Sequence, residues 1–259
     1  MSTTTASELG VERRGAILWL TIRREERRNA LSLGLLSDLK AAIAQAQDDR
    51  SVRAIVLTGA GDKAFCAGAD LQAAQAFASD PSQPTGPFAR LLRRARASHL
   101  PLVARVNGAC LAGGMGLLAM CDLAVAARHA TFGLPEVKVG VFPAQVLTVL
   151  QHLVPRRQLA ELCITGESID SAQALAMGLV NHVDDDVDAR LDWLLARIAD
   201  KSPAAIRRGL YTMKSIASMA FEESMAFTES QIALFALTED AREGQAAFRE
   251  KRPPQWTGR

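Results

Sequence analysis

The sequence predicts an α/β protein in which a sheet-forming N-terminal part is followed by helices alone. Short apolar runs alternate with helical patterns in the N-terminal half. From about Pro155 onward, apolar residues recur only at three- and four-residue spacing, which indicates helices. The composition, 49% apolar and 22% charged over 259 residues, is that of a globular protein. This length allows one large domain or two smaller ones.

Four apolar runs are predicted to be strands, because they are rich in β-branched or aromatic residues and are bounded by turn or charged residues. They are residues 16–22, 52–58, 102–106 and 122–127. Ser32 is a suitable N-cap for a helix in which Leu35, Leu39 and Ile43 share one face. Strands and helices that alternate with short connections predict helices packed on a sheet.

Six segments of the C-terminal part have helical apolar spacing. They are residues 156–164, 171–177, 187–199, 203–218, 221–237 and 239–251. We divide the chain into a flexible tail (1–10), an α/β core (11–200) and a helical region (201–259). The helical region is expected to mediate oligomerisation, because its short helices carry apolar faces that they cannot bury by themselves.

Several classes of protein are disfavoured by the composition. A formal net charge of +2 and a single tyrosine give little basis for a nucleic-acid-binding surface. The four cysteines lack CxxC spacing, so we expect reduced thiols and no metal site. The most apolar stretch, residues 106–127, contains Asn107, Asp122 and four glycines, which argues against a membrane span. The N-terminus has no apolar targeting segment, and the expected location is the cytoplasm.

Two glycine-rich segments follow predicted strands, and a third segment carries a carboxylate. Residues 64–71 read AFCAGADL and residues 107–117 read NGACLAGGMGL. Two such turns facing one another can direct two backbone N–H groups at one oxygen, which is an oxyanion hole. Glycine at a turn more often serves backbone geometry alone. Glu136, after Gly-x-Pro in an apolar stretch, is either a buried group that moves protons or a surface residue paired with Lys138.

No nucleotide-binding glycine fingerprint, GxSxG elbow or HExxH helix is present. However, five blocks in order resemble the crotonase (enoyl-CoA hydratase/isomerase) superfamily. They read FCAGADL, VNGACLAGGMGLLAMCDLAVA, ATFGLPEVKVGVFPA, LCITGESIDSAQALAMGLV and EDAREGQAAFREKRPPQW. The resemblance implies an α/β fold, a crotonase-like spiral of ββα turns over residues 11–200. It also implies a C-terminal helical trimerisation region that covers coenzyme A.

The resemblance also implies site residues. Backbone N–H groups of Ala69 and Gly113 are the expected oxyanion donors, and Glu136 is the expected general base and acid. The expected contacts to substrate or coenzyme A, beside these two donors, are Arg28, Ala30, Ala67, Asp70, Leu71, Gly116, Ala144 and Lys251. Lys251 is expected to reach the coenzyme A phosphates, in some relatives from a neighbouring subunit. No metal and no resident cofactor are expected, since coenzyme A is part of the substrate.

One position departs from the well-known hydratases, which use two glutamates. The second glutamate is Glu136, but the position of the first is Gly116. Isomerases that move a double bond between the Δ3 and Δ2 positions also have one glutamate. Some hydratases of branched or carboxylated enoyl-CoAs do too, and these share Pro143-Ala144, which Gln145 follows.

The leading hypothesis is therefore an enoyl-CoA hydratase that acts through a thioester enolate. A Δ3,Δ2-enoyl-CoA isomerase is the alternative, and a non-catalytic acyl-CoA-binding protein is the alternative of another class. The expected assembly is a homotrimer or homohexamer, with no nucleic acid and no membrane as partner.

Overall fold

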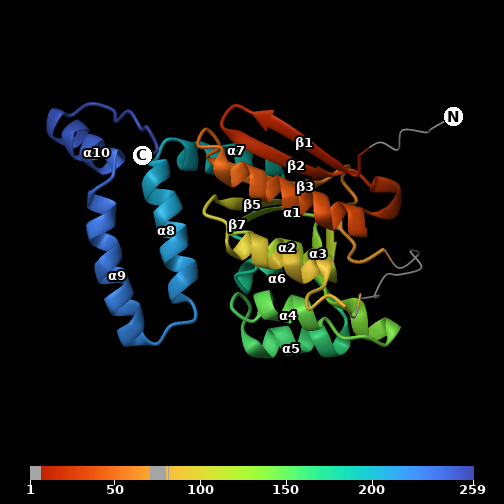
Figure 1. The fold of residues 1–259 in the computed structure, drawn as a ribbon. Coiled ribbons are helices and arrows are strands. Elements are labelled where there is room, and N and C mark those ends of the chain that lie inside the picture. The colour runs from red at the N-terminus through yellow and green to blue at the C-terminus, as the bar shows by residue number, and fades with distance from the viewer. Residues whose placement is uncertain (1–6, 71–79, 81) are drawn as a thin grey trace.

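The structure, a computed structural model, describes residues 7–70, 80 and 82–259. Within these residues the larger sheet has six strands in the order β1-β2-β3-β5-β7-β10 (Figure 1). Only β1 is antiparallel to its neighbour. The strands are β1 (Leu9–Arg14), β2 (Ile17–Ile22), β3 (Ala54–Gly59), β5 (Leu102–Val106), β7 (Leu123–Ala127) and β10 (His182–Asp184).

A second, smaller sheet carries the glycine-rich segments at its strand ends. Its order in the described part of the chain is β4-β6-β8-β9. The first three strands are parallel, and the last is antiparallel to its neighbour. These strands are β4 (Ala64–Cys66), β6 (Ala109–Leu111), β8 (Thr131–Gly133) and β9 (Ser168–Asp170). They are too short for period-two alternation to be recognised, so the sequence did not predict them.

Helices cover both faces of the larger sheet. Alternate residues of β3 belong to two apolar cores, Ile55 and Leu57 to one and Ala54 and Val56 to the other, as the pleat of a strand requires. The larger core lies under α1 (Leu33–Asp48), α2 (Pro87–Arg96) and α3 (Gly113–Ala119). The smaller core is covered by α7 (Val187–Ala199).

The remaining helices are η1 (Glu25–Arg27), η2 (Pro135–Val139), α4 (Ala144–Leu150), α5 (Arg156–Thr165), α6 (Ser171–Ala176), α8 (Pro203–Ile216), α9 (Phe221–Ala236) and α10 (Glu239–Glu250). The last five correspond to predicted segments, whereas η1, η2 and α4 were not predicted. Gly166 ends α5 with φ +66°, the left-handed C-cap that glycine favours. Asp170 and Gln173 form a capping box at the start of α6.

One expected boundary was wrong. The tail was expected to extend to residue 10, but Leu9 and Gly10 already pair with Ile22 and Thr21 in the first hairpin. The apolar side chain of Leu9 is buried in the larger core, and this burial is the physical reason for the earlier start.

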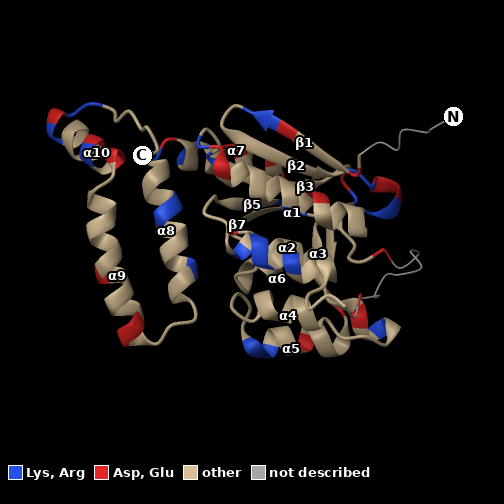
Figure 2. Ribbon diagram, in the orientation of Figure 1, with Lys and Arg blue, Asp and Glu red and all other residues tan. Residues whose placement is uncertain are grey.

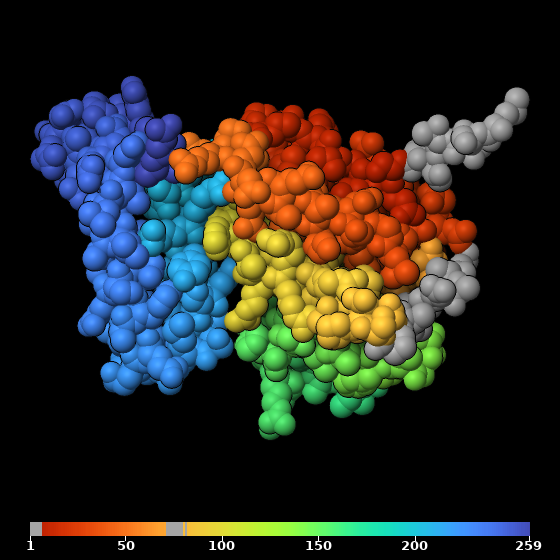
Figure 3. Space-filling model, viewed as in Figure 1, coloured from red at the N-terminus to blue at the C-terminus, as the bar shows by residue number. Residues whose placement is uncertain are grey.

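The C-terminal helices form a lobe beside the sheets (Figures 1 and 3). Two cations of α8 attach this lobe to the rest of the chain. Arg207 donates hydrogen bonds to the carbonyl oxygens of Gln47 (3.0 Å) and Asp49 (2.9 Å). Lys214 forms an ion pair with Asp122 at 2.9 Å. The division expected near residue 200 falls in the link between α7 and α8.

Candidate active site

Three parallel strand ends deliver the candidate site residues to one edge of the smaller sheet. β4 runs into Ala67–Asp70, β6 into Ala112 and Gly113, and β8 into Leu134–Glu136. Because β4, β6 and β8 are parallel neighbours, their carboxyl ends lie at the same edge. The N–H of Ala112 donates to the carbonyl oxygen of Gly133 at 2.9 Å, which extends the β6–β8 pairing to this edge.

The two glycine-rich turns are in van der Waals contact. A Cβ atom built on Gly68 would lie 2.7 Å from the Cβ of Ala112 and 3.2 Å from the amide nitrogen of Gly113. Gly68 also has φ +94°. Glycine is therefore required at position 68 for conformation and for space. The close approach places the backbone of Ala69 beside that of Gly113.

The amides of Ala69 and Gly113 lie at this close approach. Among the described residues, neither N–H donates to another backbone group in a turn, loop or cap. Gly113 is the first residue of α3, where an N–H has no partner within the helix. Ala112, just before it, has φ +50°, a strained conformation for alanine that is common at functional sites. The expected role of these two amides as oxyanion donors stays a prediction.

A short parallel bridge fixes the first turn against the loop after β2. Leu31 donates its N–H to the carbonyl of Gly68 (2.7 Å) and accepts from the N–H of Asp70 (3.1 Å). Arg24 forms ion pairs with Asp70 at 2.8 Å and with Glu8 at 2.7 Å. The Arg24 and Asp70 side chains are largely buried, so their pairing gives this loop a defined position.

Glu136 is a half-buried carboxylate with an unsatisfied oxygen. It lies in the first turn of η2. Its Oε2 atom is buried and has no hydrogen-bond partner among the described residues. Burial raises the pKa of this carboxyl above its ordinary value, although a hydrogen bond from its own backbone opposes the shift. A carboxyl group in this state is suited to accept and return a proton near neutral pH.

The alternative role of Glu136, a surface glutamate paired with Lys138, is not what the structure contains. Lys138 pairs instead with Glu167, at 2.9 Å. Behind Glu136 lies Cys163 of α5, whose thiol pKa is raised by burial and by the charge of Glu136. Cys163 is buried and free.

Gly116 lies one turn beyond Gly113 on the same face of α3. A Cβ atom there would lie 2.7 Å from Cζ of Phe88 and 3.4 Å from Cγ2 of Val146. The position is thus enclosed by apolar side chains from α2 and α4.

The expected coenzyme A contacts divide into two groups. Ala30, Ala67 and Asp70 lie along the loop after β2 and the first turn, where Arg28 accepts a hydrogen bond from the N–H of Ala67 at 3.1 Å. The Arg28 side chain is exposed. Leu71 lies outside the described residues.

Two further expected contacts, Ala144 and Lys251, lie at helix ends. Ala144 and Gln145 are exposed at the start of α4, the helix whose Val146 packs beside Gly116. Lys251 is exposed at the end of α10, which lies far from α3 in Figure 1. Within one chain, Lys251 is therefore remote from Gly113.

Sequence reasoning missed Arg24 and Phe88. Arg24 lies in a run of six charged residues after β2 (23–28), and nothing in that run distinguishes the arginine that pairs with Asp70. Phe88 precedes the arginine-rich part of α2. Its contact with Gly116 joins elements that are far apart in the sequence, so no local pattern predicts it.

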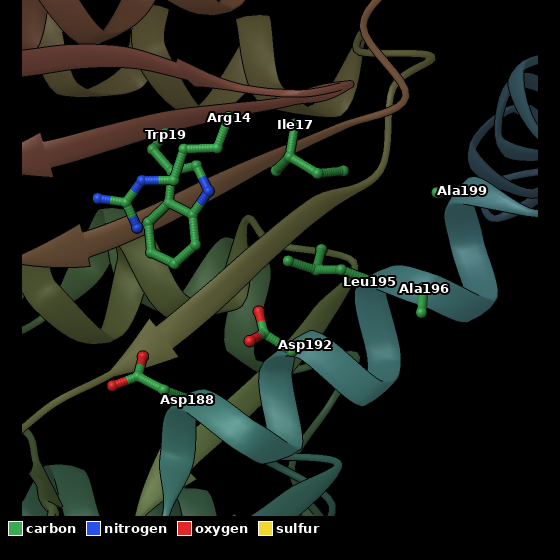
Figure 4. A pocket seen from close by; sticks show the side chains of 8 residues that line it. All are labelled: Arg14, Ile17, Trp19, Asp188, Asp192, Leu195, Ala196 and Ala199. Carbon is green, nitrogen blue, oxygen red and sulfur yellow. The ribbon is translucent and has the colours of Figure 1, made fainter.

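A described cavity lies elsewhere. It has a volume of about 440 Å³ and lies between the β1–β2 hairpin and α7, on the face of the smaller core (Figure 4). Two of its three charged side chains form ion pairs: Arg14 pairs with Glu12 at 2.8 Å and lies 4.1 Å from the centre of the Trp19 ring, while Asp188 pairs with Arg105 at 2.6 Å. None of the expected site residues lines this cavity.

The described residues contain no group of three or more His, Cys, Asp or Glu side chains placed to hold a metal ion. They also contain no helix with the length and apolar character needed to cross a membrane.

Taken together, the strands of the smaller sheet bring two glycine-rich turns and one half-buried carboxylate to the same edge of an α/β fold. Comparisons with known proteins agree with this fold. The family model described as enoyl-CoA hydratase/isomerase matches residues 12–259. The chain is 35% identical to the 2,3-dehydroadipyl-CoA hydratase of Escherichia coli, over 98% of this chain and 100% of that protein.

Two further proteins extend the likeness. The mevalonyl-coenzyme A hydratase of Aspergillus fumigatus is 35% identical, over 93% of this chain and 91% of its own length. A crystal structure of an enoyl-CoA hydratase from Mycobacterium smegmatis has a TM-score of 0.89 at 32% identity, covering 96% of this chain and 99% of that one.

The chain belongs to the enoyl-CoA hydratase/isomerase family of the crotonase superfamily. The expected crotonase-like α/β fold is confirmed. Because its relatives are named as enzymes, the chain is an enzyme and not an acyl-CoA-binding protein without activity.

Proposed function

We propose that this enzyme adds water to, or removes it from, the α,β double bond of an enoyl-CoA thioester. The observation that carries the proposal is the buried, unpartnered Oε2 of Glu136, at the sheet edge that also presents the N–H groups of Ala69 and Gly113. The carboxylate of Glu136 supplies a proton acceptor, and the two N–H groups supply donors for an oxygen that gains negative charge.

In the forward direction, the carboxylate of Glu136 takes a proton from water while the water oxygen bonds to the β-carbon. The electrons of the double bond move to the thioester oxygen, where the N–H groups of Ala69 and Gly113 stabilise the enolate. The enolate then collapses, and the carboxylic acid of Glu136 returns the proton to the α-carbon. The product has gained one water, and no resident cofactor is needed.

Isomerisation of a 3-enoyl-CoA is the second candidate. The same carboxylate would remove a proton from C2 and return it at C4, again through the enolate. Gly116 favours this candidate, because Phe88 and Val146 enclose the position and leave no polar side chain there to hold a water. The names of the relatives favour hydration. One is named as the hydratase of a carboxylated acyl-CoA, and another as the hydratase of a branched acyl-CoA. We therefore propose a branched or carboxylated acyl group for this enzyme.

We further propose that the enzyme is a homotrimer or homohexamer. α9 contacts α8 and α10, and its outer side chains Phe221, Ile232 and Leu237, the last at its C-cap, are exposed. Figure 2 shows few charged residues along this helix. A neighbouring copy would cover these side chains and would be the source of a Lys251 that reaches coenzyme A.

Mass spectrometry after incubation with a panel of 2-enoyl- and 3-enoyl-CoAs tests the reaction. The panel contains linear, branched and carboxylated acyl groups. A gain of one water from a 2-enoyl-CoA supports the hydratase. Double-bond migration without a change of mass supports the isomerase, and conversion of no member contradicts both.

A further inference from the structure

The contact between Phe88 and Gly116 has a consequence for substrate choice. Gly113 and Gly116 are three residues apart on one face of α3, and Gly116 lies about 4.5 Å further along the helix axis. If the N–H of Gly113 holds the thioester oxygen, Gly116 lies at the level of the acyl carbons just beyond the carbonyl.

The surface at that level is made by other elements. Phe88, in the first turn of α2, lies so close to Gly116 that an added Cβ would be 2.7 Å and 3.3 Å from two of its ring carbons. Val146 of α4 closes the other side, at 3.4 Å from the same point. The three atoms nearest to that point are all carbon, so the immediate surroundings of position 116 offer no partner to a carboxylate or a hydroxyl.

Phe88 is only partly buried, whereas Val146 is buried. Part of the Phe88 ring packs against the larger core, and the rest remains accessible. The ring is therefore held in position by the core and also offers an apolar face to a ligand.

We propose that Phe88 is a specificity-determining residue, whose ring contacts the acyl group beside its reacting carbons. Gly116 is the companion residue, because only glycine leaves room for the ring. The ring limits the size of substituents at these carbons and disfavours charged ones. A branch or a carboxylate further along the acyl chain is not affected. This inference rests on the proposed reaction at an enoyl-CoA.

Kinetics of Phe88→Ala and Phe88→Leu test the contact. The measured quantity is the ratio of kcat/KM for a substrate branched next to the double bond to kcat/KM for its linear counterpart. We expect this ratio to be about tenfold or more higher in Phe88→Ala than in the wild type. A smaller change is expected in Phe88→Leu. Leu92→Ala is the control, since Leu92 is buried in the same helix and its truncation loosens α2 without opening space at Gly116. An equal fall of kcat/KM for all substrates in Phe88→Ala would overturn the proposal.

A second measurement is independent of the reaction. Gly116→Ala is expected to lower the urea midpoint, because its Cβ clashes with Phe88. In the Phe88→Ala background the same change is expected to raise the midpoint, since alanine favours a helix over glycine. Additive effects would overturn the packing on which the proposal depends. If this coupling is found but wild-type enzyme converts no enoyl-CoA, the proposed reaction fails and the packing stands.

Discussion

Glu136 illustrates how one side chain can link stability to activity. Burial raises its pKa, so the fold disfavours the ionised form. A carboxyl group whose pKa is higher in the folded than in the unfolded protein stabilises the fold fully at a pH below the unfolded pKa. This contribution to the free energy of unfolding is lost as the pH rises through the folded pKa. The proposed base must nevertheless be ionised, and the site therefore keeps an unfavourable carboxylate for its chemistry.

The first prediction concerns pH. We expect Glu136→Gln to be at least as stable as the wild type at neutral pH and less stable relative to it in acid, because the variant has no carboxylate to desolvate. Urea unfolding of both proteins between pH 4 and 8 (about four pH units around the carboxyl range) measures the difference. A difference that does not change with pH would contradict the assigned burial of this group.

The second prediction concerns Gly68. Gly68→Ala is expected to reduce turnover about 100-fold or more, because its Cβ would push Ala112 and Gly113 away from Ala69 and displace an oxyanion donor. Gly15→Ala is the matched control. Gly15 also has a positive φ, +58°, but nothing lies within 4 Å of its added Cβ. Turnover of purified, folded variants is the measurement, and equal activity of the two would contradict the role of Gly68.

At the scale of elements, segments with a clear apolar pattern were predicted well. The strand at 102–106 and the helix at 187–199 have the predicted bounds. β1, with four exposed residues out of six, was not predicted. β4, β6, β8 and β9 have three residues each and were missed. The site depends on these short strands, so the sequence could indicate its turns and its carboxylate but not the sheet edge that joins them.

Asp240 is the anchor of the C-terminal elements. Its buried carboxylate accepts hydrogen bonds from Ser202 Oγ (2.7 Å) and from the backbone N–H groups of Thr257 (2.8 Å) and Gly258 (3.0 Å). Burial alone would raise its pKa, but these hydrogen bonds outweigh burial and lower it. Its stabilisation is therefore present above the ordinary pKa of aspartate and is lost as the pH falls through the lowered value.

The third prediction follows from this anchor. Asp240→Ala is expected to lower the free energy of unfolding by about 3 kcal/mol or more, since several buried donors lose their acceptor. Proteolysis at the end of α10 should increase most. Asp192→Ala, an exposed aspartate of α7, is the control. Unchanged urea midpoint and proteolysis in Asp240→Ala would exclude the anchoring role.

At the scale of the whole molecule, the C-terminal lobe exposes several large apolar side chains, among them Phe221, Ile232 and Phe248, and such side chains often mark an interface. Sequence patterning predicted such apolar faces, because the helices are amphipathic. It could not predict which helix remains uncovered, since that depends on the attachment of α8 through Arg207 and Lys214.

The fourth prediction is the response of the assembly to a charge on α9. Ile232, 69% exposed, is expected to be buried between copies, so that Ile232→Glu yields monomers. Sedimentation velocity of wild type and variant gives the masses. Glu229→Gln on the same helix is the control for a change of charge alone. A monomeric wild type would contradict the proposed oligomer.

A single carboxylate, Glu136, is proposed to perform the proton transfers of enoyl-CoA hydration. Single-turnover conversion of the best 2-enoyl-CoA by wild type and Glu136→Gln, with product mass followed over time, tests this role. We expect a gain of one water in the wild type and a rate at least about 100-fold lower in the variant, with thioester binding retained. Near-normal turnover by Glu136→Gln would exclude Glu136 as the proton-transferring group.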